Sequence, residues 1–254
     1  MPQFHLMSIP RIPHVQPGDN LAELLLQALQ QAGIVLEDGD ILAIAQKIVS
    51  KAEGRLVNLA AVSPGTEAQM VAAETGKDPR MVQLILQESE EISRKRLGVL
   101  IVRHRLGFTS ANAGIDRSNV AQMGADETVL LLPEDPDASA AHIRQQLQDH
   151  FQVNIGVVIT DSHGRPFRLG TVGVAIGIAG IPALWDRRGE LDLYGYALQH
   201  TDVAVADEIA AAAGLLMGQA AEAAPVILVR GLHLPVGDGQ ATDLVRSKEM
   251  DLYR

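Results

Sequence analysis

Cysteine is absent from the 254 residues of the sequence. Its absence excludes disulfide bonds, thiolate metal sites and a cysteine nucleophile, and it fits a reducing compartment. Positive charge is also scarce: 21 Lys and Arg residues face 31 Asp and Glu residues, which leaves a net charge of -10. No overall basic field therefore attracts nucleic acid or an anionic membrane. An anionic substrate would need a local cluster of Lys and Arg instead.

Long hydrophobic runs are missing too. The longest uncharged run, residues 169–185, is rich in Gly and shorter than the ~20 residues of a membrane-spanning helix. The amino-terminal residues lack the apolar core of a signal peptide. We therefore expect a soluble cytoplasmic protein with neither membrane nor nucleic acid as a partner. A chain of 254 residues is long enough for one large domain or two small ones.

Hydrophobic periodicity predicts helices and strands in mixed order. We expect helices over residues 20–32, 66–75, 78–92, 139–150 and 202–217. We expect strands over residues 41–45, 98–102, 155–160 and 225–229. Asp137 or Ser139 is the expected cap of the fourth helix. Because strands and helices do not alternate cleanly, the pattern favours an α+β (mixed α/β) fold. A P-loop and a Rossmann fold are not expected, because neither glycine motif is present.

The stretch "VVITDSHGRPFRLG" at residues 157–170 places polar groups after an apolar strand. Asp161 and Ser162 offer hard oxygen ligands that suit Mg²⁺ or Mn²⁺. Arg165 and Arg168 follow closely and could hold a phosphate or a carboxylate. The alternative is a capped turn with solvated arginines. His163, alone in this turn, is interpreted as structural or solvated rather than as a metal ligand.

A second acid and an amide stand in "SANAGIDRSN" at residues 110–119. Asp116 and Asn119 alone could form an Asx-turn. Together with Asp161, however, Asp116 would make a two-carboxylate metal site of the kind that bridges nucleotide phosphates.

Two lysines follow the expected strand over residues 41–45. Lys47 and Lys51 are four residues apart and share one face if this segment is helical. They could reach phosphate oxygens from there, or they could simply form the solvated start of a helix.

These segments occur in an order and spacing that identify a resemblance. The sequence resembles the coenzyme F-420 gamma-glutamyl ligase family through "IPRIPHVQPGDNL", "GDILAIAQKIVSKAEGR", "ESEE", "ANAGIDRSN", "ITDSHGRPFRLGTVGVAIGIAG" and "VAVADEIAAAAGLLMGQ". The resemblance covers nearly the whole chain. It implies a single unit over residues 1–254 with two interleaved lobes, an active-site cleft between them, and a homodimer.

The activity that the resemblance implies is a ligation. GTP would be used to join L-glutamate to coenzyme F-420-0, and further glutamates would be added to F-420-1 through gamma-linkages. GDP and phosphate would leave. Two divalent ions, Mg²⁺ or Mn²⁺, would accompany the nucleotide, and K⁺ is a possible further cofactor.

The resemblance also assigns roles to individual residues. Asp116 and Asp161 match the carboxylate metal ligands. Ser162 and Gln219 match second-metal positions that are often Thr and can be Glu in the family, so the second metal here would be held with less charge. Asn119 matches a nucleotide contact. The remaining nucleotide-binding positions are Pro10, Arg11, Ile12, Pro13, Gln46, Lys47, Lys51, Met217, Gly218 and Gln219.

An acyl-phosphate route is our hypothesis for the chemistry, because a free carboxylate lacks a good leaving group. Lys51 and Arg165, with Lys47 and the metal ions, would offset the charge of the phosphates and the carboxylate. No protein nucleophile is required. Two alternatives are a metal-dependent nucleotide phosphohydrolase and a non-catalytic module that binds a nucleotide or a deazaflavin.

Overall fold

The computed structural model describes residues 3–122 and 127–251. Its centre is a five-stranded sheet in the order β1 (His5–Ser8), β12 (Val226–Arg230), β2 (Ile41–Ala45), β8 (Gly156–Arg165) and β9 (Arg168–Ala179). β2 and β8 are parallel, and the other neighbours are antiparallel. The sheet is therefore mixed, and the expected α+β class is confirmed.

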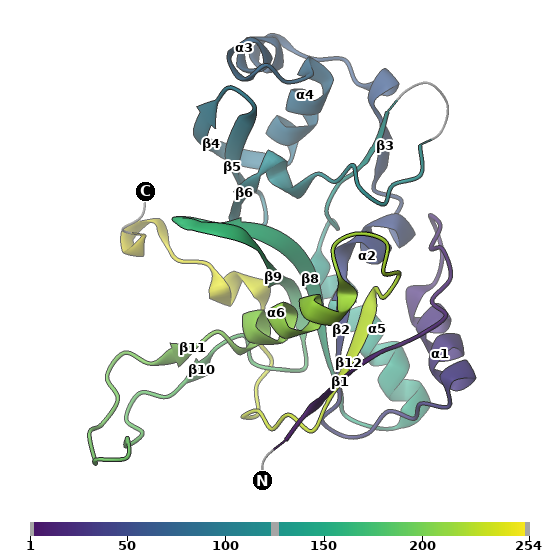
Figure 1. Cartoon of the computed structure of the whole chain (residues 1–254), viewed down its shortest axis with the longest axis vertical. Coiled ribbons are helices and arrows are strands. Elements are labelled where there is room, and N and C mark those ends of the chain that lie inside the picture. Colours follow the sequence, from purple (N-terminus) through teal and green to yellow (C-terminus); the bar gives the residue numbers. More distant parts are fainter. Residues whose placement is uncertain (1–2, 123–126, 252–254) are drawn as a thin grey trace.

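Helices cover both faces of this sheet (Figure 1). α1 (Leu21–Ala32) and α5 (Pro136–Phe151) pack on one face, and α6 (Val205–Met217) packs on the other. α1 starts where the side chain of Asn20 accepts a hydrogen bond from the N–H of Glu23. It ends at Gly33, which has a φ of 67° and closes the last turn. Within the described residues, no helix is long and apolar enough to cross a membrane.

Residues between β2 and α5 form a second, smaller core. This core contains α3 (Thr66–Thr75), α4 (Pro79–Gln87), the short helix η1 (Leu59–Ala61) and a sheet of β4 (Ser89–Arg96), β5 (Val99–His104) and β6 (Thr109–Ala111). β3 (Leu56–Asn58) pairs with β7 (Thr128–Leu130), and η2 (Asn112–Gly114) follows β6. Figure 1 shows this part above the five-stranded sheet. The cleft between two lobes stays a prediction.

A hairpin arm projects from the body between β9 and α6 (Figure 1). It contains β10 (Trp185–Asp186) and β11 (Asp202–Val203), with a long loop between them. After β12, the chain continues to the short helices η3 (Ala241–Leu244) and η4 (Lys248–Met250).

Two glycines in the uncharged run at 169–185 allow close packing of helices on β9. A side chain at Gly173 would overlap the carbonyl of Ala210 in α6, and one at Gly177 would overlap the carbonyl of Pro136 in α5. β9 therefore lies tightly between two helices, and glycine lets their backbones approach it.

The outer edge of β9 is protected by side chains of the same two helices. Asp207 Oδ1 of α6 accepts a hydrogen bond from Ala175 N at 2.8 Å, and Asp137 Oδ1 of α5 accepts one from Ile178 N at 2.7 Å. These bonds satisfy strand N–H groups that would otherwise be open to another chain.

Two expected helix starts are wrong. The fourth helix begins at Pro136, not at 139, because Asp135 caps it by accepting a hydrogen bond from Ala138 N at 3.0 Å. Neither Asp137 nor Ser139 is the cap. The fifth helix begins at Val205, not at 202, because residues 202–203 pair with β10.

Two other expected ends are also wrong. The helix expected to reach residue 92 stops at Gln87, because residues 89–96 pair with β5 as a strand. The strand expected to end at Thr160 continues to Arg165, because it pairs with β9 along that length. Asp161 therefore lies within a strand, and the chain reverses after Arg165. In both cases, pairing with a neighbouring strand determines where the element ends, and the local sequence preference does not.

Replacing Gly173 by Ala should destabilise the fold. The added methyl group would meet backbone of α6, which cannot move as a flexible side chain can, so we expect a loss of about 1–3 kcal/mol in the free energy of unfolding. Urea unfolding would measure it. Gly214→Ala is the matched control on α6, because its Cβ would meet nothing within 4 Å. Equal stability of the two variants would contradict the packing argument.

Candidate active site

The strands β1, β2 and β8 run in one direction, so their carboxyl ends lie at one edge of the sheet. α2 (Gln46–Ala52) begins directly after β2 at this edge. Lys47 and Lys51 are therefore one helical turn apart on one face, as expected if the segment is helical. Most of the polar site residues predicted from the sequence lie at this edge.

Asp116 is held against α2 by two side chains. Gln46 Nε2 donates a hydrogen bond to Asp116 Oδ2 at 2.6 Å, and Lys47 forms an ion pair with the same oxygen. The backbone of Asp116 exchanges two hydrogen bonds of 2.9 Å with Leu130. Burial raises the pKa of Asp116 despite Lys47, and the charge of Asp161 raises it further. The two carboxylates are therefore electrostatic neighbours.

Lys51 and Asn119 link α2 to the loop that follows α6. Lys51 Nζ donates to the carbonyl of Asn119 at 2.8 Å, and Asn119 Nδ2 donates to the carbonyl of Ala220 at 2.9 Å. Burial and the neighbouring charge of Lys47 lower the pKa of Lys51. An anion bound nearby would offset this repulsion and favour the charged form of Lys51.

Asp161 reaches the same region from β8. Its Oδ2 lies 3.0 Å from His163 Nε2, and the two side chains share a face of the strand. Burial alone would raise the pKa of Asp161, but the hydrogen bond to His163 and the charge of Lys47 bring it below its usual value. Asp161 is therefore an ionised acid in a nearly closed position. His163 is buried, as a structural residue would be.

Ser162 points away from Asp161. It pairs with Gly173, on the face of the sheet that α6 covers, and neighbouring residues of a strand face opposite sides. The structure thus does not place its hydroxyl beside the two carboxylates, and its role at a second metal stays a prediction.

The segment after α6 lies beside Asn119. α6 ends at Met217, and Gly218 caps it with a φ of 70°. Glu222 shapes the next turn by accepting a hydrogen bond from Ala220 N at 2.8 Å. The side chain of Gln219 is exposed on this turn. The carbonyl of Ala220 is the group of this segment that contacts Asn119. The nucleotide and metal contacts of residues 217–219 stay predictions.

Two sets of predicted site residues have no contact with Asp116, Asn119 or Asp161 among the described hydrogen bonds and ion pairs. The first set is residues 10–13, which follow β1 at the same edge of the sheet. In this segment Arg11 Nη1 donates to Gln31 O at 3.4 Å. Arg165 lies near the tip of the β8–β9 hairpin, where its Nη2 donates to Leu169 O at 2.8 Å.

The donor set fits a hard divalent cation. In the described parts of the chain, no three His, Cys, Asp or Glu residues gather as a metal site. Asp116 and Asp161 supply two carboxylates, and Mg²⁺ is often held by one or two carboxylates with phosphate oxygens and water. The ammonium of Lys47 is bound by Asp116 and lowers the pKa of Asp161, so this position already accommodates a positive charge.

Comparison with known proteins decides the family. The family model described as "F420-0:Gamma-glutamyl ligase" matches residues 10–231. The chain belongs to this family. It is 48% identical to "Coenzyme F420:L-glutamate ligase" of Methanothermobacter thermautotrophicus, over 98% of each chain. The protein of the same name from Methanopyrus kandleri is 46% identical, over 100% of this chain and 99% of the relative. That from Methanocaldococcus jannaschii is 44% identical, over 92% and 90%.

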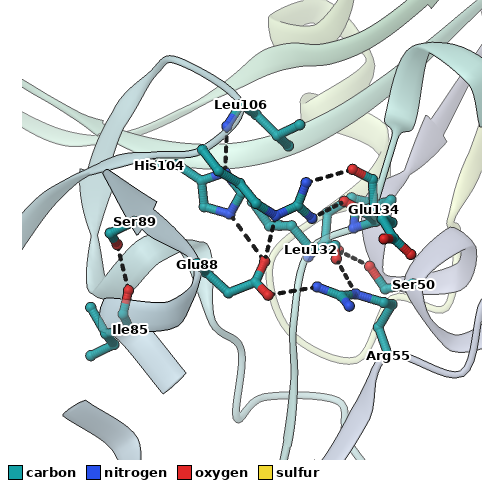
Figure 2. Close-up of polar contacts among 12 residues, drawn as sticks. Ser50, Arg55, Ile85, Glu88, Ser89, His104, Leu106, Leu132 and Glu134 are labelled. Carbon is teal, nitrogen blue, oxygen red and sulfur yellow. Dashed lines mark hydrogen bonds and ion pairs between the residues drawn. The ribbon is translucent and has the colours of Figure 1, made fainter. Parts of the chain in front are cut away.

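This member of the ligase family contains a buried charged cluster that sequence reasoning missed (Figure 2). Glu88 is 9% exposed. Its Oε1 accepts from Arg55 Nη2 at 2.8 Å, and its Oε2 accepts from Arg105 Nε at 3.0 Å. Burial alone would raise the pKa of Glu88, but His104, Arg55 and Arg105 lower it to about 2. The sequence offers no signal for this role, because Glu88 is one of three acids in "ESEE".

The Glu88 cluster, formed by Glu88, Arg55, His104 and Arg105, ties the two cores of the ligase together. Arg55 Nε donates to Leu132 O at 2.9 Å, and Arg105 Nη1 donates to Glu134 O at 2.6 Å (Figure 2). These carbonyls lie in the segment that leads into α5.

A second connection runs from the Glu88 cluster toward the candidate site. The N–H of Arg55 donates to the carbonyl of Ser50 at 2.9 Å, and Ser50 Oγ donates to Gln46 Oε1 at 2.8 Å. Because Gln46 contacts Asp116, the Glu88 cluster braces the helix that holds this acid.

Glu88→Gln should destabilise the protein by about 2–3 kcal/mol near neutral pH, because two guanidinium groups lose their buried counter-charge. A pKa lowered to about 2 makes Glu88 stabilising above its ordinary pKa of 4.5, and this contribution is lost as the pH falls toward 2. The stability difference between wild type and variant should shrink over that window.

Urea unfolding at several pH values measures the difference. Glu74→Gln is the control, because Glu74 pairs with Lys95 at 2.7 Å on the exposed surface, where an ion pair contributes little. A difference between wild type and the Glu88 variant that stays constant down to pH 3 would contradict the assignment.

Proposed function

We propose that this protein is a GTP-dependent ligase that joins L-glutamate to coenzyme F-420-0 and then adds further gamma-linked glutamates. The family supports ligation, and the names of the relatives give coenzyme F-420 and L-glutamate as substrates. The nucleotide, the acyl-phosphate route and the extension of the tail are our proposals.

The observation that carries the proposal is the convergence of acids, cations and amides at one sheet edge. Gln46, Lys47 and Lys51 of α2 contact the segment with Asp116 and Asn119, while Asp161 approaches from β8. Lysine charge beside two acids suits a site where a nucleotide and a divalent cation bind together.

The chemistry proposed has two transfers. The gamma-phosphoryl group of GTP moves to the carboxylate of F-420-0, and GDP leaves. The amine of L-glutamate then attacks the acyl carbon, phosphate leaves, and the amine gives up a proton. Lys47 and Lys51, with Arg165, offset negative charge, and Asn119 contacts the nucleotide.

A divalent ion on Asp116 and Asp161 would neutralise phosphate charge as a Lewis acid. A second ion with Ser162 and Gln219, and a helping K⁺, are further parts of the proposal.

Mass spectrometry of F-420-0 incubated with L-glutamate, GTP and Mn²⁺ tests the proposal. We expect additions of one glutamate residue at a time, with GDP and phosphate as products, and little product when ATP replaces GTP. Nucleotide turnover that does not need glutamate would indicate a phosphohydrolase. Binding without any product would indicate a non-catalytic module.

Asp116→Asn and Asp161→Asn should each lower the ligation rate about 100-fold, because a lost charge contact costs on the order of 3 kcal/mol in the barrier. Asp149→Asn is the control, since Asp149 is exposed on α5 and its Oδ1 accepts a hydrogen bond from Gln145 Nε2 at 2.8 Å, away from the site. Near wild-type turnover of either site variant at saturating Mn²⁺ would remove the metal-site assignment.

A homodimer is also part of the proposal, and the hairpin arm supports it. Leu191, Leu193, Tyr194 and Tyr196 of the arm are 69%, 98%, 95% and 56% exposed. Asp192 Oδ1 fixes the tip by accepting from the N–H groups of Tyr194 at 2.8 Å and Tyr196 at 2.9 Å. Ordered apolar side chains that face solvent are typical of an interface.

Light scattering should therefore give twice the chain mass of 27.2 kDa at micromolar concentration. The double variant Leu193→Ser and Tyr194→Ser should shift the protein toward a monomer, because it removes two apolar anchors of the proposed interface. A wild-type monomer would contradict the dimer, and a variant that stays dimeric would contradict the role of the arm.

A further inference from the structure

His163 is a buried side chain for which the proposed chemistry has no direct use. It is 9% exposed and lies two residues after Asp161 on β8. Its Nε2 is 3.0 Å from Asp161 Oδ2. Because an ionised carboxylate only accepts hydrogen bonds, Nε2 must carry the proton in this contact. The ring thus presents a fixed N–H donor to one oxygen of the acid.

The ring of His163 is held from its other side by the smaller core. It packs on Phe108 with ring centroids 4.8 Å apart and planes tilted by 52°. Phe108 stacks on His104 with centroids 5.1 Å apart and planes within 8°. Phe108 comes from the turn between β5 and β6, yet it packs against the core of the five-stranded sheet.

His104 anchors this stack to the Glu88 cluster. Its Nδ1 accepts a hydrogen bond from Leu106 N at 3.0 Å, so the proton of the neutral ring lies on Nε2. That nitrogen faces Glu88 Oε2 at 3.6 Å. The N–H of His104 also donates to Phe108 O at 2.8 Å, which closes the turn. The two histidine rings at the ends of the stack are therefore each held by a hydrogen bond, and Phe108 lies between them.

We infer that His163 is a positioning residue that orients Asp161 through its N–H donor. This inference rests on the role proposed for Asp161. The ring packs on Phe108 and so fixes the donor, and the donor fixes one oxygen of the carboxylate. A cation would then meet the carboxylate in one fixed orientation. Hydrogen bonds of this kind, one step removed from a ligand, change metal affinity by ~10- to 100-fold.

Two substitutions separate the packing of His163 from its hydrogen bond. His163→Phe keeps an aromatic ring on Phe108 but removes the donor. His163→Gln restores an N–H donor without the ring. If His163 only fills space, the Phe variant should behave as wild type and the Gln variant should be the worse of the two. If it positions Asp161, the order reverses.

Mn²⁺ binding, measured by electron paramagnetic resonance without nucleotide, is the first readout, and kcat and KM for ligation are the second. We expect His163→Phe to weaken Mn²⁺ binding at least tenfold and to lower kcat at least tenfold, with the KM for glutamate little changed. His163→Gln should recover Mn²⁺ affinity to within threefold of wild type. His142→Phe is the control, because His142 is exposed on α5 and contacts Gln146.

Circular dichroism confirms that each variant is folded. If His163→Phe fails to fold, His163→Met replaces it as the variant without a donor, with the same expectation. Wild-type Mn²⁺ affinity in the folded apolar variant would overturn the inference, and so would a loss of affinity in His163→Gln equal to that of the apolar variant. A different result would contradict the proposed function: wild-type protein that forms no glutamylated product. The binding comparison still decides the role of His163 in that case.

Discussion

The buried carboxylate of Glu88 is the contact on which the arrangement of the two cores depends. It lies between two guanidinium groups that come from different parts of the chain, Arg55 and Arg105. Each arginine also donates to a carbonyl in the segment that leads into α5. A buried charge is costly unless it is paired and hydrogen-bonded, so this geometry permits few alternatives. The smaller core is therefore fixed to the larger one at a defined position.

The candidate site inherits its geometry from this fixed position. Asp116 belongs to the smaller core, whereas Asp161 belongs to a strand of the main sheet. The Glu88 cluster reaches the first acid through Ser50 and Gln46 and the second through the stack that ends at His163. Two acids from separate cores thus meet at one sheet edge because the same cluster braces both.

The sequence predicts what depends on local pattern, and it misses what depends on distant partners. The range 41–45 reads as a strand from its apolar residues alone, and the spacing of Lys47 and Lys51 shows that they share a face if helical. The family resemblance selects the residues that converge on Asp116. The length of β8 was underestimated, however, because its polar half is a strand only through pairing with β9. The orientation of Ser162 follows from that same pairing.

Glu88 is invisible to sequence reasoning for a related physical reason. Its neighbours in the chain are also acids, and only the approach of Arg55 and Arg105 distinguishes it from them. The predicted helix caps failed more mildly, by a few residues, because several acids near Pro136 could serve as the cap. Hydrophobic periodicity does not show which charged residues pair across the chain. It also does not show which of several neighbouring acids caps a helix.

The parallel pairing of β2 with β8 has a consequence for how the chain reaches its native state. The whole of residues 56–131, with its own hydrophobic core, lies between these two strands in the sequence. Closing so long a loop is entropically slow when the loop is a random coil, and a loop that has already collapsed has its ends closer together. We therefore expect an insert that folds early to bring the ends of β2 and β8 together and so to speed completion of the main sheet.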